Sequence, residues 1–168
     1  MSAPAVIDSV EFALAARQLA GSLPATSLGR LDDLTYDAEG GVDYKISGEQ
    51  DGRGRPRLRL RITGRLHLRC QRCLGLLAHE IDVTNTLLIV APGAIPAWEL
   101  DDPEGPDTVD ASAELDVAAL VEDEVLLSLP LAPRHPEGAC GSRMDKQDDE
   151  GADARSAFGK LAALKRPR

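Results

Sequence analysis

The stretch that decides the fold runs from Arg57 to Cys70 and reads Arg-Leu-Arg-Leu-Arg-Ile-Thr-Gly-Arg-Leu-His-Leu-Arg-Cys. Apolar and polar residues alternate along it with a period of two, which is typical of a β-strand with one buried and one solvated face. The solvated face is strongly basic, because it carries Arg57, Arg59, Arg61, Arg65 and Arg69. Gly64 lies in the middle and predicts a bulge or a bend there.

Two shorter alternating segments flank this strand, at residues 42–48 and 79–90. Strands that follow one another through short connections pair antiparallel. We therefore expect a meander of 42–48, 57–70 and 79–90. We expect Glu80 and Asp82 to lie across the hairpin from Arg69 and Arg65.

Two helices are expected around this sheet. The apolar residues from Phe12 to Ala20 predict a helix that ends near Gly21, before Pro24. Residues 117–128 predict a second helix with Asp116 as its N-cap, and its apolar stripe can cover the sheet. That stripe consists of Val117, Leu120, Val121 and Val125. The adjacent acids of this helix, Glu122, Asp123 and Glu124, are expected on a solvated face.

The fold class is therefore α+β, an antiparallel β-meander packed by one or two helices, with an acidic loop and a flexible basic C-terminal tail. A chain of 168 residues, 43% of them hydrophobic, has enough apolar side chains for one core. We expect residues 1–140 to form a single domain, 141–156 an acidic linker and 157–168 a basic amphipathic tail. No apolar run approaches the ~18 residues of a membrane-spanning helix, so no membrane contact is expected.

Charge is distributed very unevenly along the chain. The net charge is −9, yet residues 55–72 contain seven arginines and no acid, whereas residues 99–124 contain eleven acids and no base. The local field matters more to a polyanion than the total charge does. The basic strand face could therefore follow a nucleic-acid backbone, unless the acids of the 79–90 strand and the 99–124 block neutralise it. With aromatics at 3%, sequence-specific stacking on single strands is not expected.

The three cysteines form the second candidate site. An odd number of cysteines argues against a secreted disulfide scaffold and predicts a reducing cytoplasm. Cys70 and Cys73 have the spacing of a zinc knuckle at the tip of a hairpin, and His135 and Cys140 could complete a Cys3His set for one structural zinc. Unliganded thiols remain an alternative, and a redox pair is another, although no thioredoxin-like context follows.

Three blocks of this sequence resemble the YceD family, the large ribosomal RNA subunit accumulation proteins. The first is Leu68-Arg-Cys-Gln-Arg-Cys-Leu74 and the second is the 117–133 segment, which reads Val-Ala-Ala-Leu-Val-Glu-Asp-Glu-Val-Leu-Leu-Ser-Leu-Pro-Leu-Ala-Pro. His135 and Cys140 then follow at the family's spacing. The tail at 157–166 is similar to the family's closing helix, although Ser156-Ala157 stands where the family often has Asn-Pro. The resemblance implies a role in synthesis, processing or stability of large-subunit (23S) ribosomal RNA, and no known catalytic residue.

Three functions from different classes are compatible with these observations. The first is a non-catalytic ribosome-assembly factor that contacts ribosomal RNA or a pre-ribosomal particle through its basic strand face and tail. The second is a zinc-stabilised module whose acidic loop engages a basic ribosomal protein. The third is an enzyme acting on ribosomal RNA. It has little support, because the sequence lacks a phosphate-binding glycine motif or a nucleophile elbow.

Overall fold

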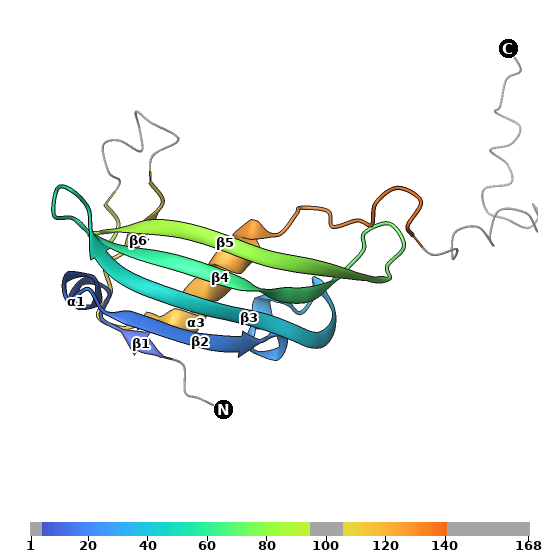
Figure 1. Ribbon diagram of the computed structural model, residues 1–168, viewed down its shortest axis with the longest axis horizontal. Helices are drawn as coiled ribbons and strands as arrows, with labels where there is room; N and C mark the ends of the chain where they lie inside the picture. Colours follow the sequence, from blue (N-terminus) through green and yellow to red (C-terminus); the bar gives the residue numbers. More distant parts are fainter. Residues whose placement is uncertain (1–4, 95–105, 141–168) are drawn as a thin grey trace, which may run out of the picture.

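The alternating stretch forms the central strand of a curved sheet (Figure 1), β4 (Pro56–Arg69), in the computed structural model, which describes residues 5–94 and 106–140. It pairs antiparallel with β3 (Thr35–Gln50) on one side and with β5 (Leu76–Val90) on the other. The expected meander is therefore confirmed, with longer outer strands than the sequence predicted. The sheet order is β2-β3-β4-β5-β6.

Two further strands extend the meander to five. The edge strand β2 (Gln18–Pro24) pairs antiparallel with β3, and the short β6 (Thr108–Asp110) pairs parallel with β5. A separate two-stranded pair consists of β1 (Val6–Ile7) and β7 (Leu115–Asp116). The α+β class with a mostly antiparallel sheet is thus confirmed.

The first helix is shorter than expected. Helix α1 (Ser9–Leu14) begins at the N-cap Asp8, whose carboxylate accepts the Glu11 N–H, and the chain leaves the helix at Ala16 with φ 48°. The prediction of a helix reaching Ala20 was wrong, because residues 18–24 pair with β3 instead. Sheet pairing that buries alternate side chains outweighs the weak helical preference of this segment. Two short 3₁₀ turns follow, Ala25–Ser27 and Gly29–Leu31.

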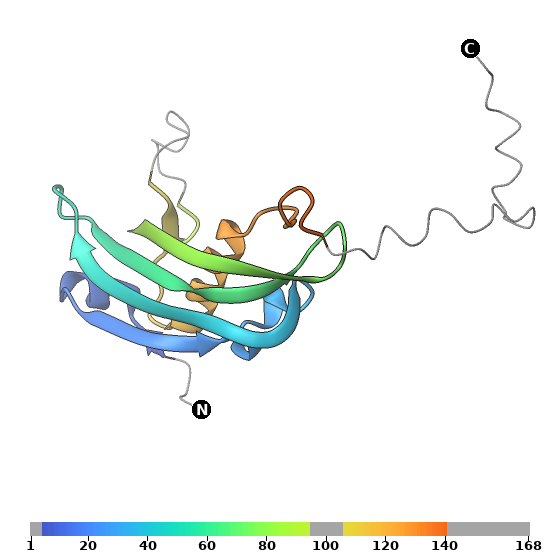
Figure 2. The ribbon, with the colours of Figure 1, turned by 45° about the vertical axis from the view of Figure 1, so that its right-hand side comes forward.

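The second helix, α3 (Val117–Ser128), forms as the sequence predicts. The Asp116 carboxylate caps it by accepting the N–H groups of Ala118 and Ala119. Its apolar stripe packs against the inner face of the sheet, which α3 crosses in both ribbon views (Figures 1 and 2). The core is aliphatic and its centre is fully buried: Leu58, Leu60, Ile62, Leu66, Leu68, Val121 and Val125 are each 0% exposed.

Gly64 produces no bulge, and β4 is not split there. The pairing of β4 with both neighbours continues without a shift from Thr63 through Arg65, so that prediction was wrong. The residue must be small for a different reason. A Cβ atom at Gly64 would lie 2.7 Å from the Cα of Val42 and closer still to the carbonyl oxygen of Gly41. Glycine therefore permits a close approach of two backbones at this point.

The expectation that the three acids of α3 lie on a solvated face was wrong for Glu122 and Glu124, whereas Asp123 is exposed. Arg30 donates from its backbone N–H to Glu122 Oε1 (2.8 Å) and from its guanidinium to Glu122 Oε2 (2.9 Å) and Asp123 Oδ1 (2.6 Å). Glu124 is 6% exposed and accepts a hydrogen bond from Asn85 Nδ2 at 2.9 Å. These acids connect α3 to the 3₁₀ turn and to β5.

Parts of the expected organisation lie outside the described residues. These are the acidic linker 141–156, the basic tail 157–168 and residues 95–105 of the acidic loop. Within 5–94 and 106–140, no helix has the length and apolar character needed to cross a bilayer.

Replacing Gly64 by alanine is expected to destabilise the protein by about 1–3 kcal/mol, because the new methyl group would overlap backbone atoms that cannot move independently. Chemical unfolding followed by circular dichroism measures this change. Gly29→Ala is the matched control, since nothing lies within 4 Å of its Cβ position, and we expect a change within about 0.5 kcal/mol. Equal midpoints for the two variants would contradict the close-approach explanation.

A pH dependence is expected from Glu124. Burial raises the pKa of this carboxyl above its ordinary value, the Asn85 hydrogen bond opposes that shift, and the charges of Asp107 and Asp123 add to it. The unfolded chain therefore loses this proton at lower pH than the folded chain. Ionisation then opposes folding, and stability is lost as pH rises from the unfolded pKa of about 4.3 through the folded value. Glu124→Gln should remove this loss, so the variant's stability relative to the unaltered protein should rise as pH increases from the unfolded pKa through the raised folded pKa of Glu124. A difference independent of pH would refute the assignment.

Candidate metal centre and basic sheet face

The tip of the β4–β5 hairpin positions the first two cysteines. Leu74 takes φ 57°, and the turn closes through Leu74 N–H to Cys70 O (2.8 Å) and Cys70 N–H to Gly75 O (3.0 Å). These bonds turn the chain so that the side chains of Cys70 and Cys73 lie on the same side of the tip. Cys70 is fully buried, whereas Cys73 is half-buried.

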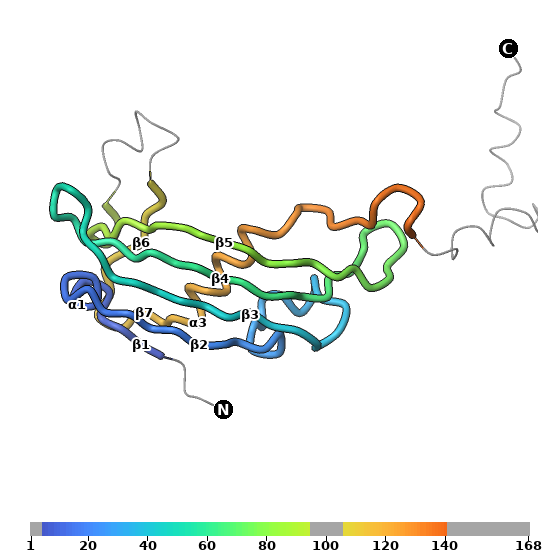
Figure 3. The backbone as a smooth tube through the Cα atoms, in the orientation of Figure 1, coloured from blue at the N-terminus to red at the C-terminus, as the bar shows by residue number. Residues whose placement is uncertain are grey.

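The segment after α3 supplies the other two side chains. From Ser128 the chain runs along β5 to the hairpin tip, as the backbone trace shows (Figure 3), and Gln71 N–H donates to Pro133 O at 2.8 Å. This hydrogen bond places His135 and Cys140 beside the turn that carries Cys70 and Cys73, which we call the knuckle. The structure thus brings together all four predicted ligands, and their donor atoms lie within 4.8 Å of one another.

The spacing of the donor atoms fits one tetrahedral ion. Cys70 Sγ lies 3.9 Å from Cys140 Sγ, and His135 Nδ1 lies 3.4 Å from Cys73 Sγ and 3.7 Å from Cys140 Sγ. Two donors bound at about 2.3 Å in tetrahedral geometry stand about 3.8 Å apart. The cluster could therefore hold a metal ion without moving its backbone, with no open coordination position, as in structural sites.

The surroundings of the cluster prepare it for a cation. His135 Nε2–H donates to Leu76 O at 2.8 Å, which leaves the lone pair of Nδ1 directed at the sulfurs. Burial opposes ionisation of Cys70, but the backbone N–H groups of Cys73, His135 and Arg72 lower its pKa to about 5. The Arg72 guanidinium donates to Cys140 Sγ at 3.0 Å and lowers the pKa of that thiol. The site therefore favours thiolate at these two cysteines, which is the form that binds metal.

The basic face of β4 is as the alternation predicts, but acids neutralise much of it. Arg57 pairs with Glu49 of β3 (2.8 Å), Arg61 pairs with Asp82 (2.8 Å) and Arg65 pairs with Glu80. Glu80 neutralises Arg65, as expected, but the rest of that prediction was wrong, because Asp82 pairs with Arg61 and Arg69 has no ion pair with the described residues. The hairpin tip spans Cys70 to Gly75, so the register places Glu80 opposite Arg65 and Asp82 opposite Thr63. The expected neutralisation is therefore real, but Asp82 neutralises Arg61 instead of Arg65 or Arg69.

Two cations of the outer face remain uncompensated at its centre. Arg59 is exposed and makes no ion pair with residues 5–94 or 106–140. Lys45 of β3 is also exposed without such a pair, and it lies opposite Arg61, whereas Ser47 lies opposite Arg59. Thr84 and Thr86 of β5 complete the surroundings, and Thr84 accepts a hydrogen bond from Arg61. We call Lys45, Arg59 and Arg61 the cationic centre of the outer face.

Sequence reasoning missed Lys45 and the exposed Tyr36. Lys45 had a usable signal, because the alternation of Val42, Tyr44 and Ile46 places it on the same face as the arginines. Tyr36 had none, because the segment before Val42 was not expected to belong to a strand.

Comparison with known proteins identifies one family. The family model described as "Large ribosomal RNA subunit accumulation protein YceD" matches residues 58–165, well over half of the chain. The matched range begins within β4 and includes the knuckle, α3 and the Cys3His cluster. No solved structure matches the chain.

Proposed function

The chain belongs to the YceD family, and from this premise we propose that it is a non-catalytic factor that supports the accumulation of 23S ribosomal RNA by binding that RNA directly. The family description carries the link to large-subunit ribosomal RNA. The cationic centre carries the proposal of direct contact, because Lys45 and Arg59 have no ion pair among the described residues, whereas Arg61 pairs with Asp82. Its location would be the cytoplasm, together with the pre-ribosomal particle.

The shape and chemistry of the outer face support a backbone contact. Cations and hydroxyl groups alternate on neighbouring strands, and both kinds of group bind phosphate oxygens. Arg59 is the centre of this contact, since its guanidinium is free to form bidentate bonds with a phosphate. Arg57, Arg61 and Arg65 could join only by exchanging their carboxylate partners for phosphate, so their contribution is expected to be smaller.

The Cys3His cluster supports a second part of the proposal, one structural zinc held by Cys70, Cys73, His135 and Cys140. Three thiolates and one imidazole are a donor set typical of structural zinc. When bound, the ion supplies cross-linking and no catalysis. It would attach the chain after α3 to the β4–β5 hairpin and so keep the end of the sheet ordered.

A second candidate function is the zinc-stabilised module that engages a basic ribosomal protein through the acidic loop. One observation favours a protein contact near the knuckle, where large apolar side chains are exposed: Leu74 by 63%, Leu76 by 40% and Leu131 by 107%. Such a cluster is a common feature of protein-binding surfaces. This candidate predicts salt-sensitive binding to a basic protein and no affinity for RNA.

Purified protein, prepared without chelator or acid, is expected to contain close to one zinc ion per chain by elemental analysis. Chelation should lower its melting temperature, because a metal that binds only the folded state stabilises it. Cys140→Ser should lose most of the zinc, whereas Glu137→Gln, an exposed change in the same loop, should retain it. A zinc content near zero, or a Cys70–Cys140 disulfide in its place, would refute the metal site.

Arg59→Glu and Lys45→Glu are expected to weaken binding to a fragment of 23S ribosomal RNA. They should also flatten the dependence of log affinity on log salt concentration, by about one unit of slope for each phosphate that is no longer neutralised. Fluorescence anisotropy over a range of salt concentrations measures both effects. Arg17→Glu is the control, because it changes the charge equally at an exposed arginine that pairs with Glu11 of α1, on the other side of the sheet. Unchanged affinity and slope in the Arg59 and Lys45 variants would overturn the proposed RNA contact.

A further inference from the structure

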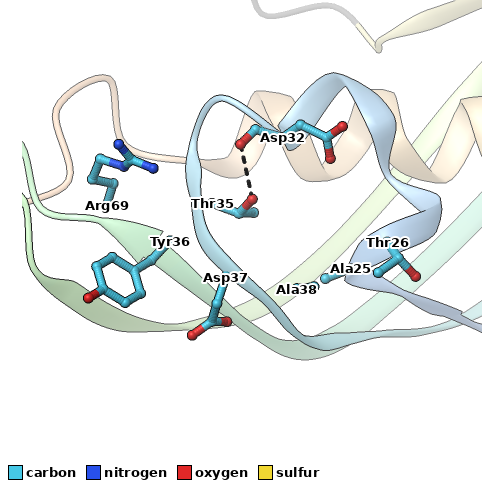
Figure 4. Close-up of a pocket in the computed structure, with 8 residues that line it drawn as sticks. All are labelled: Ala25, Thr26, Asp32, Thr35, Tyr36, Asp37, Ala38 and Arg69. Atoms are coloured by element: carbon cyan, nitrogen blue, oxygen red, sulfur yellow. Dashed lines mark hydrogen bonds between the residues drawn. The ribbon is translucent and has the colours of Figure 1, made fainter.

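A hollow of about 260 Å³ lies beside the end of β4, next to the metal centre but separate from it (Figure 4). Its walls come from the 3₁₀ turn at Ala25, from the start of β3 and from Arg69. Its volume is below the range of about 300–1,000 Å³ that is usual for pockets that enclose a drug-sized ligand. It therefore suits a ligand the size of one base rather than a large cofactor.

An irregularity in β3 creates the hollow. Thr35 pairs with Leu68 and Gly40 pairs with Leu66, so β3 has three more residues than β4 between these two pairs, and the segment 36–39 leaves the ladder. The Asp37 carboxylate fixes this segment by binding His67 Nδ1 (2.9 and 3.0 Å) and by accepting the Glu39 N–H (3.0 Å). Bulges of this kind redirect a side chain away from the sheet.

The residue redirected by the bulge is an aromatic one that the fold does not use. Tyr36 is 46% exposed, whereas Phe12 is buried in the core and Tyr44 packs over Gly21. Tyr36 is thus the exposed aromatic side chain in the part of the chain that the structure describes. An exposed ring held on an anchored segment is suited to stack on a planar ligand.

Arg69, the cationic side chain that lines the hollow, is available to the ligand that stacks on Tyr36. Arg69 is exposed and has no ion pair within residues 5–94 and 106–140. Asp37 does not compete for it, because His67 holds the Asp37 carboxylate. Figure 4 shows Arg69 and Tyr36 near each other at one side of the view, and Asp32, farther from them, also lines the hollow. Asp32 could accept a hydrogen bond from an amino group of a base or from a ribose hydroxyl.

We propose that this hollow binds one unpaired nucleotide of RNA, with the base stacked on Tyr36 and a phosphate held by Arg69. The inference rests on the proposed function, and it extends the RNA path along the sheet. Arg59 and Arg69 lie on the same face of β4, about 33 Å apart along the strand at about 3.3 Å per residue. One RNA single strand could therefore contact the cationic centre with one nucleotide and place a later nucleotide of the same strand in the hollow. Duplex RNA keeps its bases stacked and cannot place one on Tyr36.

The test compares binding of three labelled RNAs by fluorescence anisotropy: a single strand of about ten nucleotides, within the range of known single-strand sites, the same strand with abasic residues, and its duplex. Tyr36→Ala is expected to weaken binding of the intact single strand by about five-fold to a hundred-fold, the usual effect of losing a base stack. Tyr36→Phe keeps the ring and should retain affinity. Arg69→Gln should weaken binding and flatten its salt dependence.

The abasic strand and the duplex make the test specific. The unaltered protein should bind the abasic strand as weakly as Tyr36→Ala binds the intact strand, and Tyr36→Ala should not weaken abasic or duplex binding further. Since Tyr36 is half exposed, its replacement should leave the melting temperature unchanged. An equal loss for intact, abasic and duplex RNA would overturn the base-stacking role.

Failure of this inference is distinguishable from failure of the proposed function. Unchanged single-strand affinity in Tyr36→Ala, with weakened binding in Arg59→Glu, would overturn the hollow and leave the RNA contact intact. Absence of RNA binding by the unaltered protein would overturn both. Free adenosine monophosphate should compete only at far higher concentration than the single strand. Competition at equal concentration would show a site for free nucleotides instead.

Discussion

The packing of β4 between two antiparallel neighbours is the constraint on which the rest of the structure depends. Its inner side chains are fully buried, so a shift of one residue would move every leucine to solvent and every arginine into the core. The register of β3 and β5 is therefore strongly determined. So is the placement of Lys45 beside Arg61, of Glu80 beside Arg65, and of the hairpin tip that carries Cys70 and Cys73.

The position of residues 131–140 also depends on β4, because this segment contacts the knuckle at the end of that strand. Helix α3 packs on the inner face, and the segment after it reaches the hairpin tip, where Pro133 O accepts the Gln71 N–H. This bond, the hydrogen bond from Arg72 to Pro136 O and the four ligand side chains are long-range contacts of residues 131–140, which form no helix or strand of their own. A metal ion at this point would therefore stabilise a segment that little else holds in place.

Electrostatics on the outer face explain how an acidic protein can present a polyanion-binding surface. Most arginines of β4 have carboxylate partners on the flanking strands, which lowers the repulsion within the row. Exposed pairs of this kind contribute little to stability, about 0–1 kcal/mol each. On this face, and among the residues that the structure describes, their main effect is to leave Lys45, Arg59 and Arg69 as the unpaired cations, where a phosphate can bind without displacing an acid.

The sequence by itself determined the central strand, its two neighbours, α3 with its cap, and the Cys70–Cys73 pair. These features are local: alternation, capping and Cys-x-x-Cys spacing are each readable within a few residues. The sequence also offered His135 and Cys140 as candidate ligands, but only the tertiary structure brings them to this pair. Only the tertiary structure decided that residues 18–24 pair as an edge strand, that Glu80 faces Arg65, that Arg30 binds the α3 acids and that Tyr36 leaves the sheet. Each of these depends on which distant backbone lies alongside. Pairing energy and burial between remote segments settle that choice, and neither is encoded in the residues of one segment alone.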